Sequence, residues 1–436
     1  MNKLTLTVTP SDALIDEPRH IVVTHATPGK VVKVVARTIR GGQVAWESQA
    51  TFIADAHGTV DLAHDAPSAG AYSGVSSMGL IWSQQPLVKG FREVFGDRVT
   101  DPLTTTLTAT AASGDRCETI LVQRLVAAGV SRKEIRDGGL VGTLFTPSGS
   151  GPHPAVIVLN GSNGGINEPR AALYASQGYA TLALGYFRAP GMSDYISNTP
   201  LEYFQHGMDW IRHHVRPAHD FVALSGQSRG GELVLLLGAT FPEAVSAVVA
   251  YVPGAVVHSG QNAADPKVGR DGPAWLLGGK PIPHVWENNR YATWKPFDDG
   301  PPPHRHERAI LTALQDQDAV ARARIRVEDI RGPVMCLSGT DDGSWPSSRY
   351  SRMVCDALHA AHHPYQVKWL DFKDAGHAIL FPYVPTTQLV YTHPVSGRIS
   401  TGGGQPAANA IADEQSWAGV KKFLYEAVAH RANGAG

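Results

Sequence analysis

Apolar and polar positions alternate along the first 120 residues, as they do in half-buried β-strands. β-branched residues dominate these segments, and Pro, Gly or Asp residues stand at the turns between them. The predicted strands cover residues 4–10, 20–26, 30–39, 47–54 and 104–111. Short strands separated by turns are typical of an antiparallel sandwich. We therefore predict that residues 1–120 form an all-β, immunoglobulin-like sandwich domain.

From residue 121 onwards, continuous apolar runs alternate with segments of helical periodicity. The apolar runs predict buried strands at residues 155–159, 179–184, 221–224, 245–252, 333–337 and 366–370. The helical segments lie near residues 169–177, 200–214, 233–237, 347–361 and 412–432. This alternation is typical of a mostly parallel sheet with helices on both faces. Residues 121–436 are therefore predicted to form one α/β domain.

One long segment, residues 254–325, interrupts the alternation. It is rich in Pro and Trp, and its only clear helical periodicity lies near residues 309–324. Long insertions that follow a strand end are often lids over a pocket. We therefore expect this insertion to be a lid.

A strand, a sharp turn and a helix follow one another directly between residues 221 and 237. The turn reads Gly226-Gln227-Ser228-Arg229-Gly230, and in this context G-x-S-x-G predicts a nucleophile elbow. Such a turn holds its serine in a strained backbone conformation and exposes Oγ at the carboxyl end of the sheet. The flanking glycines are small enough for strand and helix to approach each other. A glycine-rich turn with a solvated serine is the alternative interpretation.

A serine hydroxyl is a poor nucleophile at neutral pH and needs a histidine base that an acid orients. In open α/β sheets, the acid and then the histidine follow later strand ends. Asp341 and Asp342 follow the strand at 333–337, and His377 follows the strand at 366–370. We favour Asp342, because Asp341 can serve to stabilise the turn. The predicted catalytic triad is therefore Ser228, Asp342 and His377, with a solvent-facing loop histidine as the alternative for His377.

Acyl transfer also needs donors for the negative oxygen of the tetrahedral intermediate. The backbone N–H of Arg229, the residue after the nucleophile, is one predicted donor. We expect the N–H of Ser162 to be the second, because Ser162 lies in the Gly-rich loop that follows the strand at 155–159. An ordinary strand–helix turn is the alternative for this loop.

Composition excludes several other classes of protein. The 436-residue chain is 43% hydrophobic and 18% charged, with a formal net charge of −1, which favours neither nucleic acid nor an anionic membrane as partner. Three scattered cysteines argue against a disulfide framework. We find no signal peptide and no apolar run of about 18 residues, so we expect a cytoplasmic protein without a membrane span.

Several histidines lie outside the predicted triad. His359, His362 and His363 have a spacing that could suit a metal, but a helix C-terminus favours cationic side chains in any case. His304 and His306 are expected in a solvated loop. We therefore expect neither a metal nor a cofactor, and no feature of the sequence sets an oligomeric state.

Segments in both halves of the chain resemble the acyl-CoA thioesterase / bile-acid-CoA:amino-acid N-acyltransferase family. In the first half, the segments similar to the family's sandwich domain are Asp-Glu-Pro (16–18), Trp-Glu-Ser (46–48) and Met-Gly-Leu-Ile-Trp-Ser (78–83). In the second half, those similar to its hydrolase domain are GTLFTP (142–147), LEYFQHGMDWI (201–211), GQSRGGEL (226–233) and GHAILFPYVP (376–385). The resemblance implies an α/β-hydrolase domain with a nucleophile at Ser228, an acid at Asp342 and a base at His377.

Two residues depart from the family pattern. The N-acyltransferase branch resembles this chain but has cysteine at the nucleophile, where this chain has Ser228. An acyl-serine is an oxyester and reacts less readily with amines than a thioester does, which favours hydrolysis. Arg229 stands where many members have lysine, and its side chain is expected either to meet a CoA phosphate or to pack along the helix surface.

The leading hypothesis is hydrolysis of an acyl-CoA thioester to CoA and a free acid through an acyl-serine intermediate. An esterase or lactonase, or an acyltransferase that uses an amine or alcohol acceptor, would employ the same triad. A non-catalytic binding protein on a hydrolase scaffold is the hypothesis from a different class.

Overall fold

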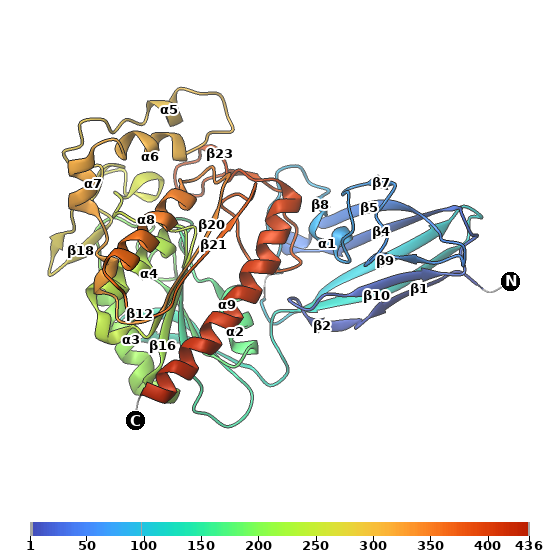
Figure 1. The fold of residues 1–436 in the computed structure, drawn as a ribbon, viewed down its shortest axis with the longest axis horizontal. Coiled ribbons are helices and arrows are strands. Elements are labelled where there is room, and N and C mark those ends of the chain that lie inside the picture. Colours follow the sequence, from blue (N-terminus) through green and yellow to red (C-terminus); the bar gives the residue numbers. More distant parts are fainter. Residues whose placement is uncertain (1–2, 97, 435–436) are drawn as a thin grey trace. The chain divides into compact units, whose positions relative to one another are not determined.

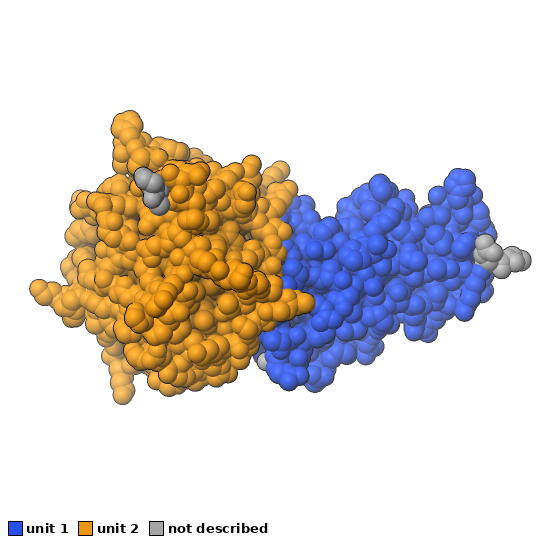
Figure 2. All heavy atoms as spheres, turned by 90° about the horizontal axis from the view of Figure 1, so that it is seen from below, with its two compact units in different colours: residues 1–127, 380–389, 405–414 blue, residues 128–379, 390–404, 415–436 orange. Residues whose placement is uncertain are grey.

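The computed structural model describes residues 3–96 and 98–434. The chain forms two compact units, which Figure 2 colours separately. Unit 1 contains Met1–Ala127, Leu380–Leu389 and Gln405–Glu414, and unit 2 contains Ala128–Ile379, Val390–Gly404 and Gln415–Gly436. The predicted boundary at residue 120 lies inside a strand that continues to Arg124, and two segments near the C-terminus group with unit 1 instead of the predicted second domain.

Unit 1 contains two β-sheets in its described residues (Figure 1). The three-stranded sheet consists of β1 (Thr5–Thr9), β3 (His20–Thr24) and β6 (Val60–Asp61). The second sheet has the order β2 (Asp12–Leu14), β10 (Arg116–Arg124), β9 (Leu103–Ala111), β4 (Val31–Ile39), β5 (Ala45–Ile53) and β7 (Ala69–Gly70), with β8 (Gln85–Pro86) also paired to β5. Unit 1 also contains a short helix, α1 (Gly79–Trp82), and the first residues of the C-terminal helix α9 (Pro406–Gly434).

Alternating burial confirms the five strands predicted in this unit. In β4, for example, Val32, Val34 and Ala36 are buried while the residues between them are more exposed. The prediction of a purely antiparallel arrangement is wrong at one edge, because β2 runs parallel to β10. β2 is only three residues long, which is too short for an alternating pattern to reveal it.

Unit 2 is built on an eight-stranded sheet within the described residues. Its strand order is β11 (Ser131–Asp137), β12 (Leu140–Thr146), β14 (Ala180–Gly185), β13 (Ala155–Leu159), β16 (Val222–Gln227), β17 (Ala247–Tyr251), β20 (Val334–Gly339) and β21 (Val367–Phe372). The β11–β12 and β12–β14 pairs are antiparallel, and every later pair in this order is parallel. The carboxyl ends of the parallel strands therefore share one edge of the sheet.

Helices pack against this sheet, as the alternating pattern predicts (Figure 1). They are α2 (Glu168–Ser176), α3 (Glu202–Val215), α4 (Arg229–Thr240) and α8 (Ser347–Ala360). All residues of β13 and β17 are buried, which explains why these strands are continuous apolar runs. The last helix, α9 (Pro406–Gly434), begins earlier than the predicted start near residue 412.

The insertion at residues 254–325 is packed into the apolar core of unit 2. Its elements are β18 (Trp275–Leu277), β19 (Lys280–Pro281), α5 (Lys295–Asp298), α6 (Glu307–Ala313) and α7 (Gln317–Ala323). β18 also pairs with β15 (Thr199–Pro200), and the rings of Trp286 and Trp294 stack with centroids 3.9 Å apart. The single helix predicted near 309–324 is two helices, because Asp316 caps a new one.

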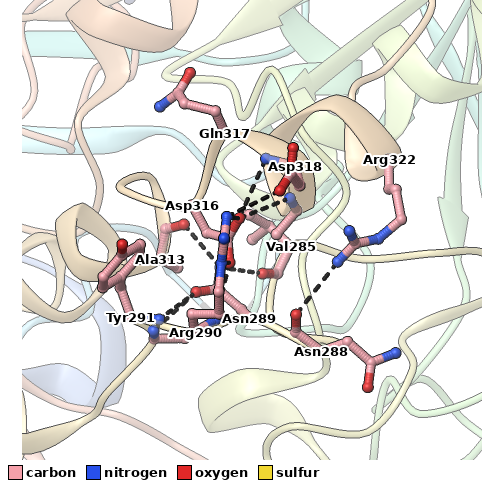
Figure 3. Close-up of polar contacts among 12 residues, drawn as sticks. Val285, Asn288, Asn289, Arg290, Tyr291, Ala313, Asp316, Gln317, Asp318 and Arg322 are labelled. Atoms are coloured by element: carbon pink, nitrogen blue, oxygen red, sulfur yellow. Dashed lines mark hydrogen bonds and ion pairs between the residues drawn. The ribbon is translucent and has the colours of Figure 1, made fainter.

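Asp316, in the turn between α6 and α7, bonds to Arg290 in the loop that precedes α5 (Figure 3). Its carboxylate accepts hydrogen bonds from the N–H groups of Asp318 and Ala319 at the start of α7, at 3.2 and 3.3 Å. It also accepts hydrogen bonds from the backbone N–H, Nε and Nη2 of Arg290, at 2.9, 2.9 and 2.8 Å. Asn289 adds bonds from Nδ2 to the carbonyls of Val285 and Ala313.

Within residues 3–96 and 98–434, none of the helices combines the length and the apolar composition that crossing a bilayer requires.

The Asp316 contacts predict a pH-dependent contribution to stability. The hydrogen bond from Arg290 is the main cause that lowers the pKa of Asp316 below its ordinary value of 3.8. A carboxyl group whose pKa is lowered in the folded state stabilises the fold at pH values above its ordinary pKa. This contribution to stability is lost progressively as the pH falls below the ordinary pKa. Asp316→Asn should therefore lower the thermal unfolding midpoint at pH 7, and the difference from the unmutated protein should shrink below pH 3.8.

Asp318→Asn is the matched control, because its carboxylate also pairs with Arg290 but is 76% exposed. It should change the unfolding midpoint much less than Asp316→Asn does. Equal effects of the two substitutions, or a difference that does not depend on pH, would contradict this account.

Candidate active site

Ser228 occupies the turn between β16 and α4 with φ 59° and ψ −120°. A positive φ is strained for a residue with a Cβ, so the predicted strained serine is confirmed. A Cβ added to Gly226 would lie 2.1 Å from the Gly230 carbonyl oxygen, and one added to Gly230 would lie 2.5 Å from the Leu159 carbonyl oxygen. Only glycine fits at these two positions, which confirms why the motif needs both.

The loop after β13 lies against this serine. A Cβ placed on Gly161 would be 3.2 Å from Ser228 Cβ and 3.7 Å from its Oγ. Within the loop, Asn160 Oδ1 accepts a hydrogen bond from the Gly161 N–H at 3.0 Å, and Asn160 Nδ2 donates to the Gly164 carbonyl at 2.6 Å. In the described part of the chain, the Ser162 N–H has no hydrogen-bond partner. It is therefore free to meet a ligand.

The Arg229 N–H is the other predicted donor, and it belongs to the first residue of α4. The first N–H groups of an α-helix have no carbonyl partner within the helix and point out from its N-terminus. This end also carries the positive end of the helix dipole. The position therefore suits a group that develops negative charge beside Ser228.

His377 and Asp342 are joined by a hydrogen bond of 2.9 Å between Nδ1 and Oδ2. The other carboxylate oxygen of Asp342 accepts hydrogen bonds from the N–H groups of Ser344 and Trp345, at 2.8 and 3.1 Å. The side chain of Asp342 is 1% exposed and that of His377 is 15% exposed. These contacts fix the orientation of the imidazole and leave its Nε2 available.

Asp341 has a different environment, although it is adjacent in the sequence. Its Oδ1 accepts a hydrogen bond from Arg305 at 2.9 Å, and its Oδ2 accepts one from the Gly404 N–H at 2.9 Å. Of the two aspartates, it is therefore Asp342 that contacts His377, while Asp341 stabilises neighbouring loops.

Gln227, the residue before the serine, connects the nucleophile turn to the histidine loop. Gln227 Nε2 donates to the His377 carbonyl at 3.3 Å. One Arg170 nitrogen donates to both Gln227 Oε1 and the Ile379 carbonyl, at 3.2 and 3.1 Å.

Within residues 3–96 and 98–434, no hydrogen bond joins Ser228 Oγ to the imidazole of His377. Catalytic hydrogen bonds are often loose without substrate and shorten in the substrate complex.

The Arg229 side chain is buried, so both predicted roles for it, contact with a CoA phosphate and packing along the helix surface, are wrong. It forms an ion pair with Glu232, and the two side chains are 2% and 0% exposed. It also donates to the Ser259 carbonyl at 2.8 Å and to Gln261 Oε1 at 3.0 Å, both in the insertion. Burial raises the pKa of Glu232, and the charge of Arg229 opposes this rise. The pair therefore fixes α4 to the insertion.

Two further histidines near the site are buried. His306, which we expected in a solvated loop, stacks on Trp294 and bonds through Nδ1 to the Ser344 carbonyl, and burial lowers its pKa to about 3. His393 Nε2 lies 3.4 Å from Ser162 Oγ. No sequence motif around His393 indicated that it would lie near the site. His363, from the histidine group near the end of α8, bonds to the Gly332 carbonyl. Among the residues that the structure describes, no group of three or more His, Cys, Asp or Glu side chains could hold a metal ion.

The buried ion pair predicts a large effect of removing its cation. Arg229→Met leaves Glu232 as an unpaired carboxylate in the core, and we expect the free energy of unfolding in urea to fall by about 3–5 kcal/mol. Arg349→Met is the control, because Arg349 is exposed on α8 and its loss should cost no more than about 0.5 kcal/mol. Removing both charges with Arg229→Met and Glu232→Gln should recover part of the loss. An unchanged stability of Arg229→Met would contradict this role.

Two family models match the chain. Residues 16–137 match the model described as acyl-CoA thioester hydrolase/BAAT N-terminal region, and residues 199–430 match the model described as BAAT / acyl-CoA thioester hydrolase C terminal. Among solved structures, a bacterial heroin esterase is similar with 16% identity and a TM-score of 0.40, over 69% of this chain and 85% of that chain. That likeness is too weak to support an argument.

Curated relatives match nearly the full length. Acyl-coenzyme A thioesterase 6 of Mus musculus is 30% identical, over 96% of each chain. Bile acid-CoA:amino acid N-acyltransferase of Mus musculus is 28% identical, also over 96% of each chain. Acyl-coenzyme A thioesterase 1 of Rattus norvegicus is 29% identical, over 96% of this chain and 95% of the relative. The chain therefore belongs to the acyl-CoA thioesterase / bile acid-CoA:amino acid N-acyltransferase family.

Proposed function

We propose that this protein hydrolyses an acyl-CoA thioester to CoA and a free acid, with Ser228, His377 and Asp342 as its catalytic triad. The observation that carries the proposal is the His377–Asp342 hydrogen bond at the sheet edge where the strained Ser228 turn also lies. The full-length similarity to named acyl-CoA thioesterases supports the choice of thioester. The strand order of unit 2 supports an α/β-hydrolase domain, and the two sheets of unit 1 support an immunoglobulin-like sandwich.

The bond to Asp342 decides which imidazole nitrogen acts as the base. A carboxylate can only accept, so Nδ1 of His377 holds a proton and donates it to Asp342. Nε2 is then unprotonated and takes the proton of Ser228 Oγ as this oxygen attacks the thioester carbon. Asp342 stabilises the imidazolium that results.

The attack converts the thioester carbonyl oxygen into an oxyanion. The N–H groups of Arg229 and Ser162 donate to this oxygen, and neither gives up another hydrogen bond to do so. The intermediate collapses by breaking the carbon–sulfur bond, and the proton on Nε2 goes to the departing thiolate. CoA leaves, and the acyl group remains on Ser228 as an oxyester.

A water molecule completes the cycle. His377 Nε2 takes a proton from this water as its oxygen attacks the acyl-serine, and the same donors hold the second oxyanion. Collapse of this intermediate breaks the bond to Ser228 Oγ, and Nε2 returns the proton to the serine. The free acid leaves, and the enzyme regains its starting protonation state.

Substitutions in the triad test this mechanism. Ser228→Ala should abolish turnover of short-, medium- and long-chain acyl-CoAs. Turnover is measured as the release of the free thiol of CoA. Asp342→Asn should lower kcat by about 10⁴-fold, because the amide no longer holds the active tautomer of His377. Asp341→Asn is the matched control and should retain most of the activity, since its carboxylate pairs with Arg305. Thiol release by Ser228→Ala at the rate of the unmutated protein would exclude this mechanism.

Transfer to an amine is the second candidate, because relatives named as amino acid N-acyltransferases match this chain as fully as the thioesterases do. The oxyester at Ser228 favours water over an amine acceptor. We expect the unmutated protein to yield only free acid from acyl-CoA in the presence of glycine or taurine, measured by mass spectrometry. Ser228→Cys, which forms an acyl thioester, should raise the ratio of amide to free acid. Amide as the main product of the unmutated protein would show that it is a transferase.

A further inference from the structure

His393 lies in the turn between two short strands, β22 (Val390–Thr392) and β23 (Ile399–Thr401), and its side chain is buried. The following residues pack against two of the proposed catalytic loops. The Gly402 carbonyl accepts hydrogen bonds from the N–H groups of His377 and Gly343, at 2.8 and 2.9 Å. The segment 390–404 therefore contacts the loop of the proposed base and the loop of the proposed acid.

The hydrogen bonds of His393 identify its tautomer. Its Nδ1 accepts from the N–H groups of Val395 and Ser396, both at 3.3 Å, so this nitrogen is unprotonated. Nε2 then holds the proton and donates it to Ser162 Oγ at 3.4 Å. Burial, together with the charge of Arg188, lowers the pKa of His393 to about 4, so the ring is neutral at pH 7.

The position of Ser162 depends on its hydrogen bond with His393, whereas other hydrogen bonds hold the neighbouring residues of the loop. Asn160 holds Gly161 and Gly164, and Arg188 donates to the Asn163 carbonyl at 3.0 Å. In the described part of the chain, His393 provides the one hydrogen bond to Ser162. The residue with the free N–H is thus held through its side chain by a histidine from a segment far along the sequence.

We propose that His393 is a positioning residue for the oxyanion site: it fixes Ser162 so that the N–H of this residue faces the thioester oxygen. This inference rests on the proposed function. Because Ser162 Oγ accepts the hydrogen bond from His393, its own hydroxyl proton also remains available to the oxyanion. An oxyanion donor works only within about 2.7–3.1 Å of the developing charge, so a loop that shifts by about 1 Å loses much of this stabilisation.

Four variants separate this role from ordinary packing. His393→Phe keeps a ring of similar size but removes the donor to Ser162 and also the Nδ1 acceptor of the Val395 and Ser396 N–H groups. His393→Gln replaces Nε2 with an amide nitrogen. Ser162→Ala removes the acceptor, and the double variant His393→Phe/Ser162→Ala tests whether the two residues act as a pair. His363→Phe is the control, because His363 is partly buried and its ring bonds to the backbone carbonyl of Gly332, outside the proposed site.

Two readouts report on the same oxyanion site. The first is kcat and KM for acyl-CoA hydrolysis. The second is the rate constant for phosphonylation of Ser228 by a fluorophosphonate, in which Oγ attacks phosphorus and fluoride leaves. The phosphoryl oxygen gains negative charge in this transition state and occupies the oxyanion position, and the reaction needs no knowledge of the natural acyl group. Thermal unfolding of each variant shows whether it is folded.

We expect His393→Phe to lower kcat and the phosphonylation rate constant by about tenfold while KM stays within about twofold, which is less than the full loss of an oxyanion donor. His393→Gln should restore most of the rate, and the double variant should lose no more than the greater single loss. If no acyl-CoA is hydrolysed but phosphonylation shows this pattern, the thioesterase assignment fails and the role of His393 stands. A folded His393→Phe with unchanged phosphonylation, or losses that multiply in the double variant, would overturn the inference.

Discussion

The backbone conformation of Ser228 is the constraint on which the rest of the site depends. A positive φ at a residue with a Cβ costs of order 1–3 kcal/mol, and surrounding structure must hold it. Gly226 and Gly230 provide this support, because no larger residue would let β16, α4 and the loop after Leu159 approach so closely. The close approach brings the N-terminus of α4 and the Gly161 loop to the same serine. One strained residue thus assembles the nucleophile and the proposed oxyanion donors.

A buried ion pair at the start of α4 connects this turn to the insertion. Arg229 and Glu232 pair inside the core, and Trp275 Nε1 donates to Glu232 at 2.9 Å. A buried ion pair is stabilised when its remaining donors find partners, and the insertion accepts hydrogen bonds from Arg229 at the Ser259 carbonyl and Gln261 Oε1. Among the described residues, Nε of Arg229 has no hydrogen-bond partner. The insertion is therefore part of the core that supports the nucleophile helix. Hydrogen bonds from Arg229 to Ser259 and Gln261, and from Trp275 to Glu232, hold these insertion residues against α4. If the insertion moves as a lid, the moving residues are therefore others.

The sequence predicted the elements that follow local rules. β13 and β17 are continuous apolar runs because both faces of these strands are buried, and G-x-S-x-G indicated the turn because only glycine permits its close contacts. Local features explain two errors, the short strand β2 and the cap at Asp316, whereas the errors at the site came from contacts between distant residues. His306 lies in a Pro-rich, polar stretch, but packing on Trp294 buries it. His393 was not recognised, because its contact with Ser162 spans 231 residues and no local motif marks it.

We propose that the acyl group of the substrate is transferred to Ser228 before water releases it. Rapid mixing of the protein with an acyl-CoA, acid quenching within milliseconds, and mass spectrometry of the digested protein test this claim directly. The account predicts a peptide that contains Ser228 and is heavier by one acyl group, formed together with the first equivalent of free CoA. Free CoA released with no acylated peptide at any time, or an acyl group on a residue other than Ser228, would contradict it.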